Sequence, residues 1–267
     1  MPLNLEQIMT ASNETTVAIG PGTFCWHEVN TRAPAETIAF LTAVFGWTTE
    51  PMDVPKGSYT LFKRGEDTVC GCLEMTEEWP EGVPDHWQSY IAVEDVRETA
   101  GRVESIGGTV VVPPFDIPIG IMSVLQDPRA GSFSIMQGGD GRKPIGVGAI
   151  VHDELLATDL AASLSFYEAL IGWTDATAPI DGQDYHMLMM NDEMKAGAMA
   201  APPEAHLPGN MWLPYVQVED VDATIAKVVE RSGAVAMPPS DIPTVGRVAV
   251  FTSPQNATLA VWMPAAE

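Results

Sequence analysis

Basic residues are scarce in this chain of 267 residues: 13 Lys and Arg stand against 36 Asp and Glu, a formal net charge of −23. A field of that sign repels the phosphates of nucleic acids and the anionic surfaces of membranes. The sequence also lacks an apolar run near the roughly 20 residues that a membrane-spanning helix needs. We therefore expect no nucleic-acid partner and no membrane partner. Because 46% of the residues are hydrophobic, we expect a soluble globular protein.

Cysteine is scarce as well. Cys25, Cys70 and Cys72 are too few for a disulfide framework, and an odd number leaves at least one free thiol. Cys70 and Cys72 face the same side of a strand if one forms here, but two thiols do not make a zinc site, so packing is the favoured interpretation. The first residues, MPLNLEQIMTASNETT, lack the basic start and continuous apolar core of a secretory signal. We expect a cytoplasmic protein.

The two halves of the chain repeat each other. WHEVNTRAPAETIAFLTAVFGW, from Trp26, aligns with HDELLATDLAASLSFYEALIGW, from His152, at an offset of 152 − 26 = 126. WQSYIAVEDV, from Trp87, aligns with WLPYVQVEDV at an offset of 125, as PPFDIP does with PPSDIP. Only two copies are present, so the chain is a duplicated domain and not a solenoid.

Within each copy, a strand, a helix and three strands follow one another twice. Residues 34–45 carry apolar side chains at helical spacing, with Pro34 in the first turn and Gly46 as the stop. Asp159 caps the equivalent helix of the second copy, which ends at Gly172. A later helix begins with the capping box Asp95 and Glu98. The PPxDIP segments are expected to connect strands. The four recurring tryptophans are expected to pack in the core or between domains: Trp47, Trp87, Trp173 and Trp212.

These patterns predict an α+β fold with two tandem domains. Residues 1–21 are expected to form a flexible arm, 22–138 the first domain, 139–147 a linker and 148–264 the second domain.

The duplicated βαβββ order, the Gly-Trp that ends the first helix of each copy, VEDV and PPxDIP together resemble the vicinal oxygen chelate superfamily of glyoxalases, bleomycin-resistance proteins and extradiol dioxygenases. The resemblance spans about residues 22–264 and is greatest to tandem glyoxalase-like proteins described as hydroxylases or 27 kDa antigens. It implies that each pair of modules curls into an open, barrel-like sheet. Helices cover the outside of such a sheet, and the concave face holds the ligand.

The resemblance also implies positions for a divalent metal, because active members bind one with His or Glu on the strands of the modules. Those positions fall on Trp26, Gln88 and Ser134 in the first copy, with Glu74 as a further candidate, and on His152, Leu213 and Ala260 in the second. A catalytic metal normally needs about three protein ligands. We therefore predict no metal and no other cofactor. The alternative is a divalent metal at His152 and Glu154, completed by ligands from elsewhere in the fold.

The concave faces keep one carboxylate in both copies. Strand alternation places Glu28 beside Trp26 and Glu154 beside His152. A carboxyl group in an apolar cavity has a raised pKa, which suits general acid or base catalysis. These two are the predicted catalytic residues. The alternative is a structural role, bonded to the backbone or to an arginine such as Arg32, Arg64 or Arg247.

The predicted ligand-binding side chains are mostly aromatic, because such side chains stack on organic ligands and carry a polar tip. They are Trp26, Tyr59, Tyr90, His152, Tyr185 and Tyr215, with packing as the alternative role.

Three functions remain open at this point. The first is a metal-free glyoxalase-like protein that encloses a small organic molecule and transfers a proton at a carbonyl, as a lyase or isomerase. The second is a binding or resistance protein without catalysis. The third is a metal-dependent glyoxalase or dioxygenase with a rearranged site. The expected partner is a small organic molecule, and the protein is expected to be a monomer or homodimer.

Overall fold

The structure is a computed structural model that describes residues 15–138, 141–180 and 182–265. The predicted order of strand, helix and three strands occurs four times. In the first half these elements are β2 (Phe24–Thr31), α2 (Pro34–Phe45), β3 (Thr48–Met52), β4 (Tyr59–Arg64), β5 (Asp67–Glu74), β6 (His86–Ala92), α3 (Val96–Val103), β7 (Thr109–Ile117), β8 (Gly120–Gln126) and β9 (Ser132–Gly138). In the second half they are β11 (Ile150–Ala157), α4 (Leu160–Ile171), β12 (Thr174–Ile180), β13 (Gln183–Met190), β14 (Glu193–Ala200), β15 (Met211–Gln217), α5 (Val221–Glu230), β16 (Ala234–Ile242), β17 (Gly246–Thr252) and β18 (Thr258–Pro264).

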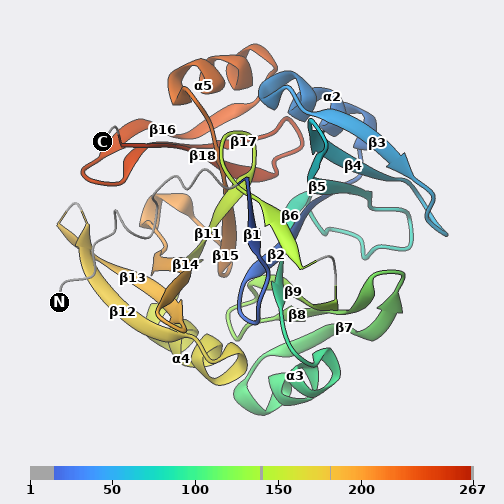
Figure 1. The fold of residues 1–267 in the computed structure, drawn as a ribbon, viewed down its shortest axis with the longest axis vertical. Coiled ribbons are helices and arrows are strands. Elements are labelled where there is room, and N and C mark those ends of the chain that lie inside the picture. Colours follow the sequence, from blue (N-terminus) through green and yellow to red (C-terminus); the bar gives the residue numbers. More distant parts are fainter. Residues whose placement is uncertain (1–14, 139–140, 181, 266–267) are drawn as a thin grey trace.

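Each half of the chain builds one curled sheet of eight strands, which confirms the predicted α+β class. The strand order is β3-β4-β5-β2-β6-β9-β8-β7 in the first sheet and β12-β13-β14-β11-β15-β18-β17-β16 in the second. The helices lie at the outer rim of the molecule, with α2 beside α5 and α3 beside α4 (Figure 1). Each helix therefore covers the convex side of a sheet and leaves the concave side for other contacts.

The helices begin and end where the sequence predicts. Pro34 stands in the first turn of α2, and Gly46 ends it with φ of 70° in the left-handed region. The side chain of Asp95 accepts the backbone N–H of Glu98 at the start of α3, as the capping box predicts.

The expectation for the PPxDIP segments was wrong, because all residues of each segment except its last proline lie within β7 or β16 and not between strands. These are the outermost strands of their sheets. The pairing register shifts between Val112 and Phe115, across Pro113 and Pro114. An edge strand with a bulge tolerates proline, since the missing N–H is not needed by a neighbouring strand.

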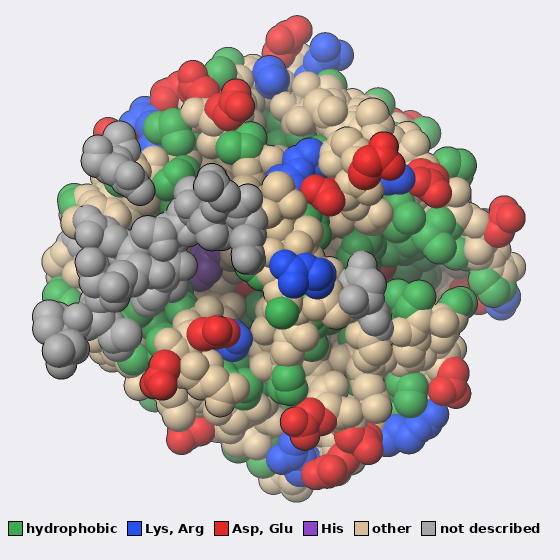
Figure 2. Space-filling model, in the orientation of Figure 1, with side chains coloured by type: hydrophobic (Ala, Val, Ile, Leu, Met, Phe, Trp, Pro, Cys, Tyr) green, Lys and Arg blue, Asp and Glu red, His purple; other side chains and the backbone are tan. Residues whose placement is uncertain are grey.

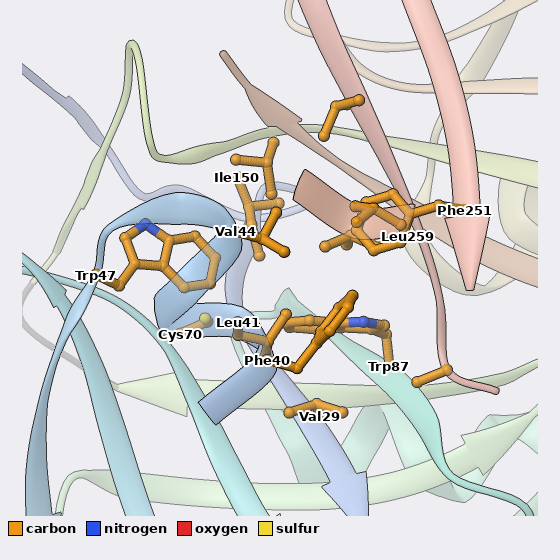
Figure 3. Close-up of a cluster of buried hydrophobic side chains, with 14 of the residues drawn as sticks. Val29, Phe40, Leu41, Val44, Trp47, Cys70, Trp87, Ile150, Phe251 and Leu259 are labelled. Carbon is orange, nitrogen blue, oxygen red and sulfur yellow. The ribbon is translucent and has the colours of Figure 1, made fainter. Parts of the chain in front are cut away.

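The hydrophobic core joins the two domains. One cluster combines Val29, Phe40 and Trp47 of the first domain with Phe251 and Leu259 of the second (Figure 3). A second cluster also combines residues of both domains, and it includes buried side chains of α3 and α4. The four recurring tryptophans are all buried in these clusters, as predicted: Trp47, Trp87, Trp173 and Trp212. Cys70 and Cys72 are buried in the first cluster too, which confirms packing as their role.

A short two-stranded sheet involves both predicted connecting segments. β1 (Thr16–Ala18), from the end of the predicted arm, pairs antiparallel with β10 (Arg142–Pro144), from the predicted linker. The first 14 residues of the arm lie outside the described residues. Among the helices that are described, none has the length and apolar character needed to cross a membrane.

Candidate functional site

The concave face of the first sheet is built from alternate residues of its central strands. In β2, Trp26, Glu28 and Asn30 share this face, while His27 and Val29 point to the convex side, toward the second domain and the core. In β6, His86, Gln88 and Tyr90 lie opposite them, in the pairs Asn30–His86, Glu28–Gln88 and Trp26–Tyr90. The strand pairing therefore brings residues from distant parts of the sequence onto one surface.

Glu28 is the centre of a hydrogen-bonded cluster in the first domain. The hydroxyl of Tyr59 donates to its Oε2 at 3.0 Å and the hydroxyl of Tyr90 donates to its Oε1 at 2.7 Å. The Trp26 Nε1–H donates in turn to the Tyr59 hydroxyl oxygen at 3.0 Å. The structure thus brings together Trp26, Tyr59 and Tyr90 around Glu28.

The second domain repeats this cluster. Tyr215 donates from its hydroxyl to Glu154 Oε2 at 2.7 Å. His152 Nε2 lies 3.1 Å from the hydroxyl oxygen of Tyr185. This contact is a hydrogen bond whose direction depends on the tautomer of His152.

Trp26 and His152 therefore occupy corresponding positions in the two clusters. Each has a ring nitrogen that hydrogen-bonds to a tyrosine hydroxyl, Trp26 to Tyr59 and His152 to Tyr185. The copies differ at this position in residue type but agree in hydrogen bonding, which the sequence alignment does not reveal.

Two glycines make room for the tyrosines. A Cβ added at Gly71 lies 2.2 Å from the Tyr59 hydroxyl, and one added at Gly197 lies 1.8 Å from the Tyr185 hydroxyl. Gly71 pairs with Glu28 and Gly197 pairs with Glu154, so each tyrosine crosses the strand directly beside the carboxylate. Our sequence reasoning missed these glycines, although a glycine inside a strand often marks such a close approach.

Burial sets the electrostatics of both clusters. It raises the pKa of Glu28 and of Glu154, while the hydrogen bonds from the tyrosines lower these pKa values and offset part of the effect. Burial and the adjacent carboxylate hold the pKa of each tyrosine well above 10. Burial also lowers the pKa of His152 to about 4. The tyrosines are thus protonated donors and His152 is neutral near pH 7.

Arg32, Arg64 and Arg247 bind other partners than Glu28 and Glu154. Arg32 donates to the carbonyl of Pro80, Arg64 pairs with Asp67, and Arg247 pairs with Asp222 and Asp241. The alternative in which one of these arginines partners Glu28 or Glu154 is therefore wrong, because each binds other acceptors.

The donors on the concave faces do not match a catalytic metal site. Trp26 offers only an N–H, Gln88 Oε1 already accepts from Ser132 at 3.1 Å, and His152 Nε2 is engaged by Tyr185. Glu74 pairs with Thr31, so it points away from Glu28. Within residues 15–138, 141–180 and 182–265, no three His, Cys, Asp or Glu side chains converge to hold an ion. The residues present do not fit the divalent metal that the fold family implies.

A hollow lies at the surface near the first-domain face, whose residues Glu28, Asn30 and Tyr90 are themselves buried. Figure 2 shows a hollow with hydrophobic side chains between the β3–β4 and β7–β8 hairpins. A cavity of about 440 Å³ is lined by Arg32, Glu77, Trp79, Glu81 and Gly82. The ring of Trp79 lies 6.3 Å from that of His86, so this cavity adjoins the concave face at its Asn30 end.

Comparisons with known proteins agree with this architecture. The sequence profile of the Glyoxalase/Bleomycin resistance protein/Dioxygenase superfamily matches residues 23–132 and 149–261. "Putative glyoxylase CFP32" of Mycobacterium bovis is 36% identical over 256 residues, covering 91% of this chain and 95% of that protein. "Anthracycline biosynthesis protein DnrV" of Streptomyces peucetius is 29% identical over 260 residues, covering 90% and 93%.

Solved structures share the fold at lower identity. The Mn(II)-bound glyoxalase from Novosphingobium aromaticivorans superposes with a TM-score of 0.63 at 14% identity, covering 91% of this chain and 82% of that one. The 2,3-dioxygenase LapB from Pseudomonas sp. KL28 superposes with a TM-score of 0.62 at 13% identity, covering 94% of both chains.

Proposed function

Because the chain belongs to the Glyoxalase/Bleomycin resistance protein/Dioxygenase superfamily, we propose that it binds a small, partly apolar carbonyl compound and transfers a proton beside the carbonyl without a metal. The observation that carries this proposal is the buried Glu28, held between the hydroxyls of Tyr59 and Tyr90 and repeated in Glu154. A raised pKa and two adjacent O–H donors are what enolisation of a ketone or aldehyde requires.

In the proposed reaction, the carboxylate of Glu28 removes a proton from the carbon next to the carbonyl. The C–H electron pair forms the enolate double bond, and the carbonyl electrons move to the oxygen, which accepts a hydrogen bond from Tyr59 or Tyr90. If the carbon that loses the proton also carries a hydroxyl, the hydroxyl proton moves to the enolate oxygen, and the proton on Glu28 goes to the former carbonyl carbon, which completes an isomerisation. If the proton on Glu28 first exchanges with solvent and then returns to the original carbon, the result is solvent exchange. Both outcomes leave the protein unchanged.

The names of the relatives are compatible with this class of ligand. One is called a glyoxylase, and another is assigned to anthracycline biosynthesis. We transfer from them only the expectation of a small organic ligand.

A second candidate is a binding or resistance protein that does not alter its ligand. It is favoured by the hydrogen bonds that both oxygens of Glu28 already accept in the protein, a sign of a structural network. A metal-dependent enzyme at His152 and Glu154 is less favoured, because His152 Nε2 already has a partner.

The test is incorporation of solvent deuterium into 2-hydroxyacetophenone, followed by proton NMR in D₂O. We expect the wild-type protein to catalyse exchange at the carbon that carries the hydroxyl. Glu28→Gln should slow the exchange by about a hundredfold or more, because it keeps the shape and removes the base. Binding without exchange would favour the second candidate.

A further inference from the structure

The two concave faces differ in polarity at four corresponding positions. The first domain has Asn30, His86, Gln88 and Ser134, where the second has Leu156, Met211, Leu213 and Ala260. The correspondence follows from the strand register, because Asn30 pairs with His86 as Leu156 pairs with Met211, and Tyr90 pairs with Ser134 as Tyr215 pairs with Ala260. Beside the shared Glu and Tyr cluster, one copy is polar and the other is apolar.

In the second domain these residues pack on one another. Leu156, Leu213 and Ala260 are buried and form a hydrophobic cluster of their own, with Met199, Leu207 and Met211 packed against it. These apolar side chains stabilise the domain by packing, and they offer no hydrogen-bonding group to a ligand.

In the first domain the polar residues are only partly paired with each other. Gln88 donates to Ser134 at 3.0 Å and accepts from Ser132 at 3.1 Å, so its amide is satisfied. Asn30 is 2% exposed, and across the described parts of the chain its Oδ1 is the buried side-chain atom that accepts no hydrogen bond. A buried acceptor without a partner costs about 1–3 kcal/mol, so it calls for a functional explanation.

His86 fixes the direction in which Asn30 points. The carbonyl of Pro84 lies 2.8 Å from His86 Nδ1 and can only accept, so Nδ1 carries the hydrogen. His86 Nε2 is therefore an acceptor, and it receives the N–H of Asn30 Nδ2 at 3.3 Å. This leaves Asn30 Oδ1 to point along the concave face, on the same side of β2 as Glu28.

We propose that the first domain is the ligand-binding copy and that Asn30, oriented by His86, accepts a hydrogen bond from an O–H or N–H group of the ligand. This inference rests on the proposed function, because it assumes that the concave face binds an organic molecule. The ligand then has a carbonyl near Glu28 and a hydroxyl or amide donor near Asn30. These two residues are two positions apart on β2, which corresponds to about 7 Å along the strand. The second domain serves as the scaffold against which the first one packs.

The first test measures donor preference. 4′-Hydroxyacetophenone and 4′-methoxyacetophenone differ in an O–H donor on the ring carbon opposite the carbonyl group, and their affinities are compared by isothermal titration calorimetry. We expect the wild-type protein to bind the hydroxy compound about tenfold more tightly, a difference typical of one hydrogen bond to a buried acceptor. In the double variant Asn30→Leu/His86→Met, which reproduces the pair found in the second domain, this preference should disappear.

The matched control places the polar pair in the other copy. Leu156→Asn/Met211→His should leave the preference unchanged, because the second domain does not hold the ligand. Equal affinities for the two compounds in the wild type, or a preference that survives Asn30→Leu/His86→Met, would overturn the inference. Absence of deuterium exchange with an intact preference would instead overturn only the proposed proton transfer.

The second test needs no ligand. Replacing a functional polar pair by an apolar one should raise the melting temperature of Asn30→Leu/His86→Met by about 2–4 °C, since the unpartnered acceptor is removed. The control Leu156→Asn/Met211→His should lower it. A lower melting temperature for the first-domain variant would mean that Asn30 is already satisfied, for example by an ordered water, and would contradict the inference.

Discussion

His27 Nε2 lies 2.9 Å from both carboxylate oxygens of Asp153, and the two residues occupy the same position in the two copies of the repeat, 153 − 27 = 126. Ser89 donates to the same carboxylate at 2.7 Å. All three side chains are buried between the domains, on the convex sides of β2, β6 and β11. Divergence of one repeated position into a base and an acid thus created a specific contact between the duplicated halves.

This contact predicts a large loss of stability when one partner is removed. Asp153→Ala should lower the free energy of unfolding by about 3–5 kcal/mol, because it leaves the buried His27 and Ser89 without their acceptor. Urea denaturation followed by circular dichroism measures the effect. Glu78→Ala, which removes an ion pair with the exposed Lys56, is the control and should change little. Equal effects of the two substitutions would argue against the contact.

The same contact predicts an acid-sensitive stability. Burial alone would raise the pKa of Asp153, but the charge and hydrogen bond of His27, the charge of Lys143 and the hydrogen bond of Ser89 lower it below 3.8. A lowered pKa stabilises the folded protein above the unfolded value, and this contribution is lost as the pH falls through the folded value. Between pH 5 and about pH 3, the wild type should therefore lose more stability than Asp153→Asn. Parallel denaturation series at these pH values would show it, and identical pH slopes would contradict it.

The pKa of the proposed base is shifted in the opposite direction, and this shift predicts how activity depends on pH. Burial raises the pKa of Glu28 above 4.5, so the carboxylate that removes a proton forms only at a higher pH than for an ordinary glutamate. The rate of deuterium exchange should rise with pH along a limb centred above 4.5 and level off once Glu28 is ionised. Glu28→Gln should abolish this limb. A limb that persists in that variant would assign the base to another group.

Alanine at Gly71 tests the geometry of the cluster. The added Cβ would lie 2.2 Å from the Tyr59 hydroxyl, so the tyrosine must leave Glu28. We expect Gly71→Ala to destabilise the protein by about 1–3 kcal/mol and to slow deuterium exchange at least tenfold. Gly197→Ala, with its Cβ 1.8 Å from the Tyr185 hydroxyl, should also destabilise but should leave exchange intact if the first domain is the active copy.

The control for these substitutions is Gly101→Ala in α3. Nothing lies within 4 Å of its added Cβ, so this change should stabilise the helix by about 0.5–1 kcal/mol. Exchange activity that falls equally in Gly101→Ala and Gly71→Ala would show that the loss does not come from Tyr59.

Metal content tests the proposal from another direction. We expect protein purified without chelators to contain far less than one Mn, Fe, Ni or Zn per chain by mass spectrometry, because the donors of the concave faces do not match a three-ligand site. Treatment with EDTA should leave deuterium exchange unchanged. One firmly held ion per chain, lost together with exchange in Glu154→Gln or His152→Ala, would instead support the rearranged metal site.

The sequence alone was sufficient to predict the duplication, the four βαβββ units and the ends of their helices. These features depend on local signals, such as Pro34, Gly46, Asp95 and Gly172, which act on the few residues around them. Alternation along one strand also placed Glu28 beside Trp26. The same alternation places Asn30 on the face of Glu28, so the sequence pattern could have identified Asn30 too.

Only the tertiary structure decided which side chains meet. The hydrogen bonds from Tyr59 and Tyr90 to Glu28 join residues 31 and 62 positions apart in the sequence, on three different strands. No single segment of the sequence determines how these strands pair. The equivalence of Trp26 with His152, the contact between His27 and Asp153 and the unpartnered oxygen of Asn30 likewise arise from pairing across strands or domains. Local propensity is a property of neighbours in the chain, whereas these contacts depend on how the complete sheets curl and pack.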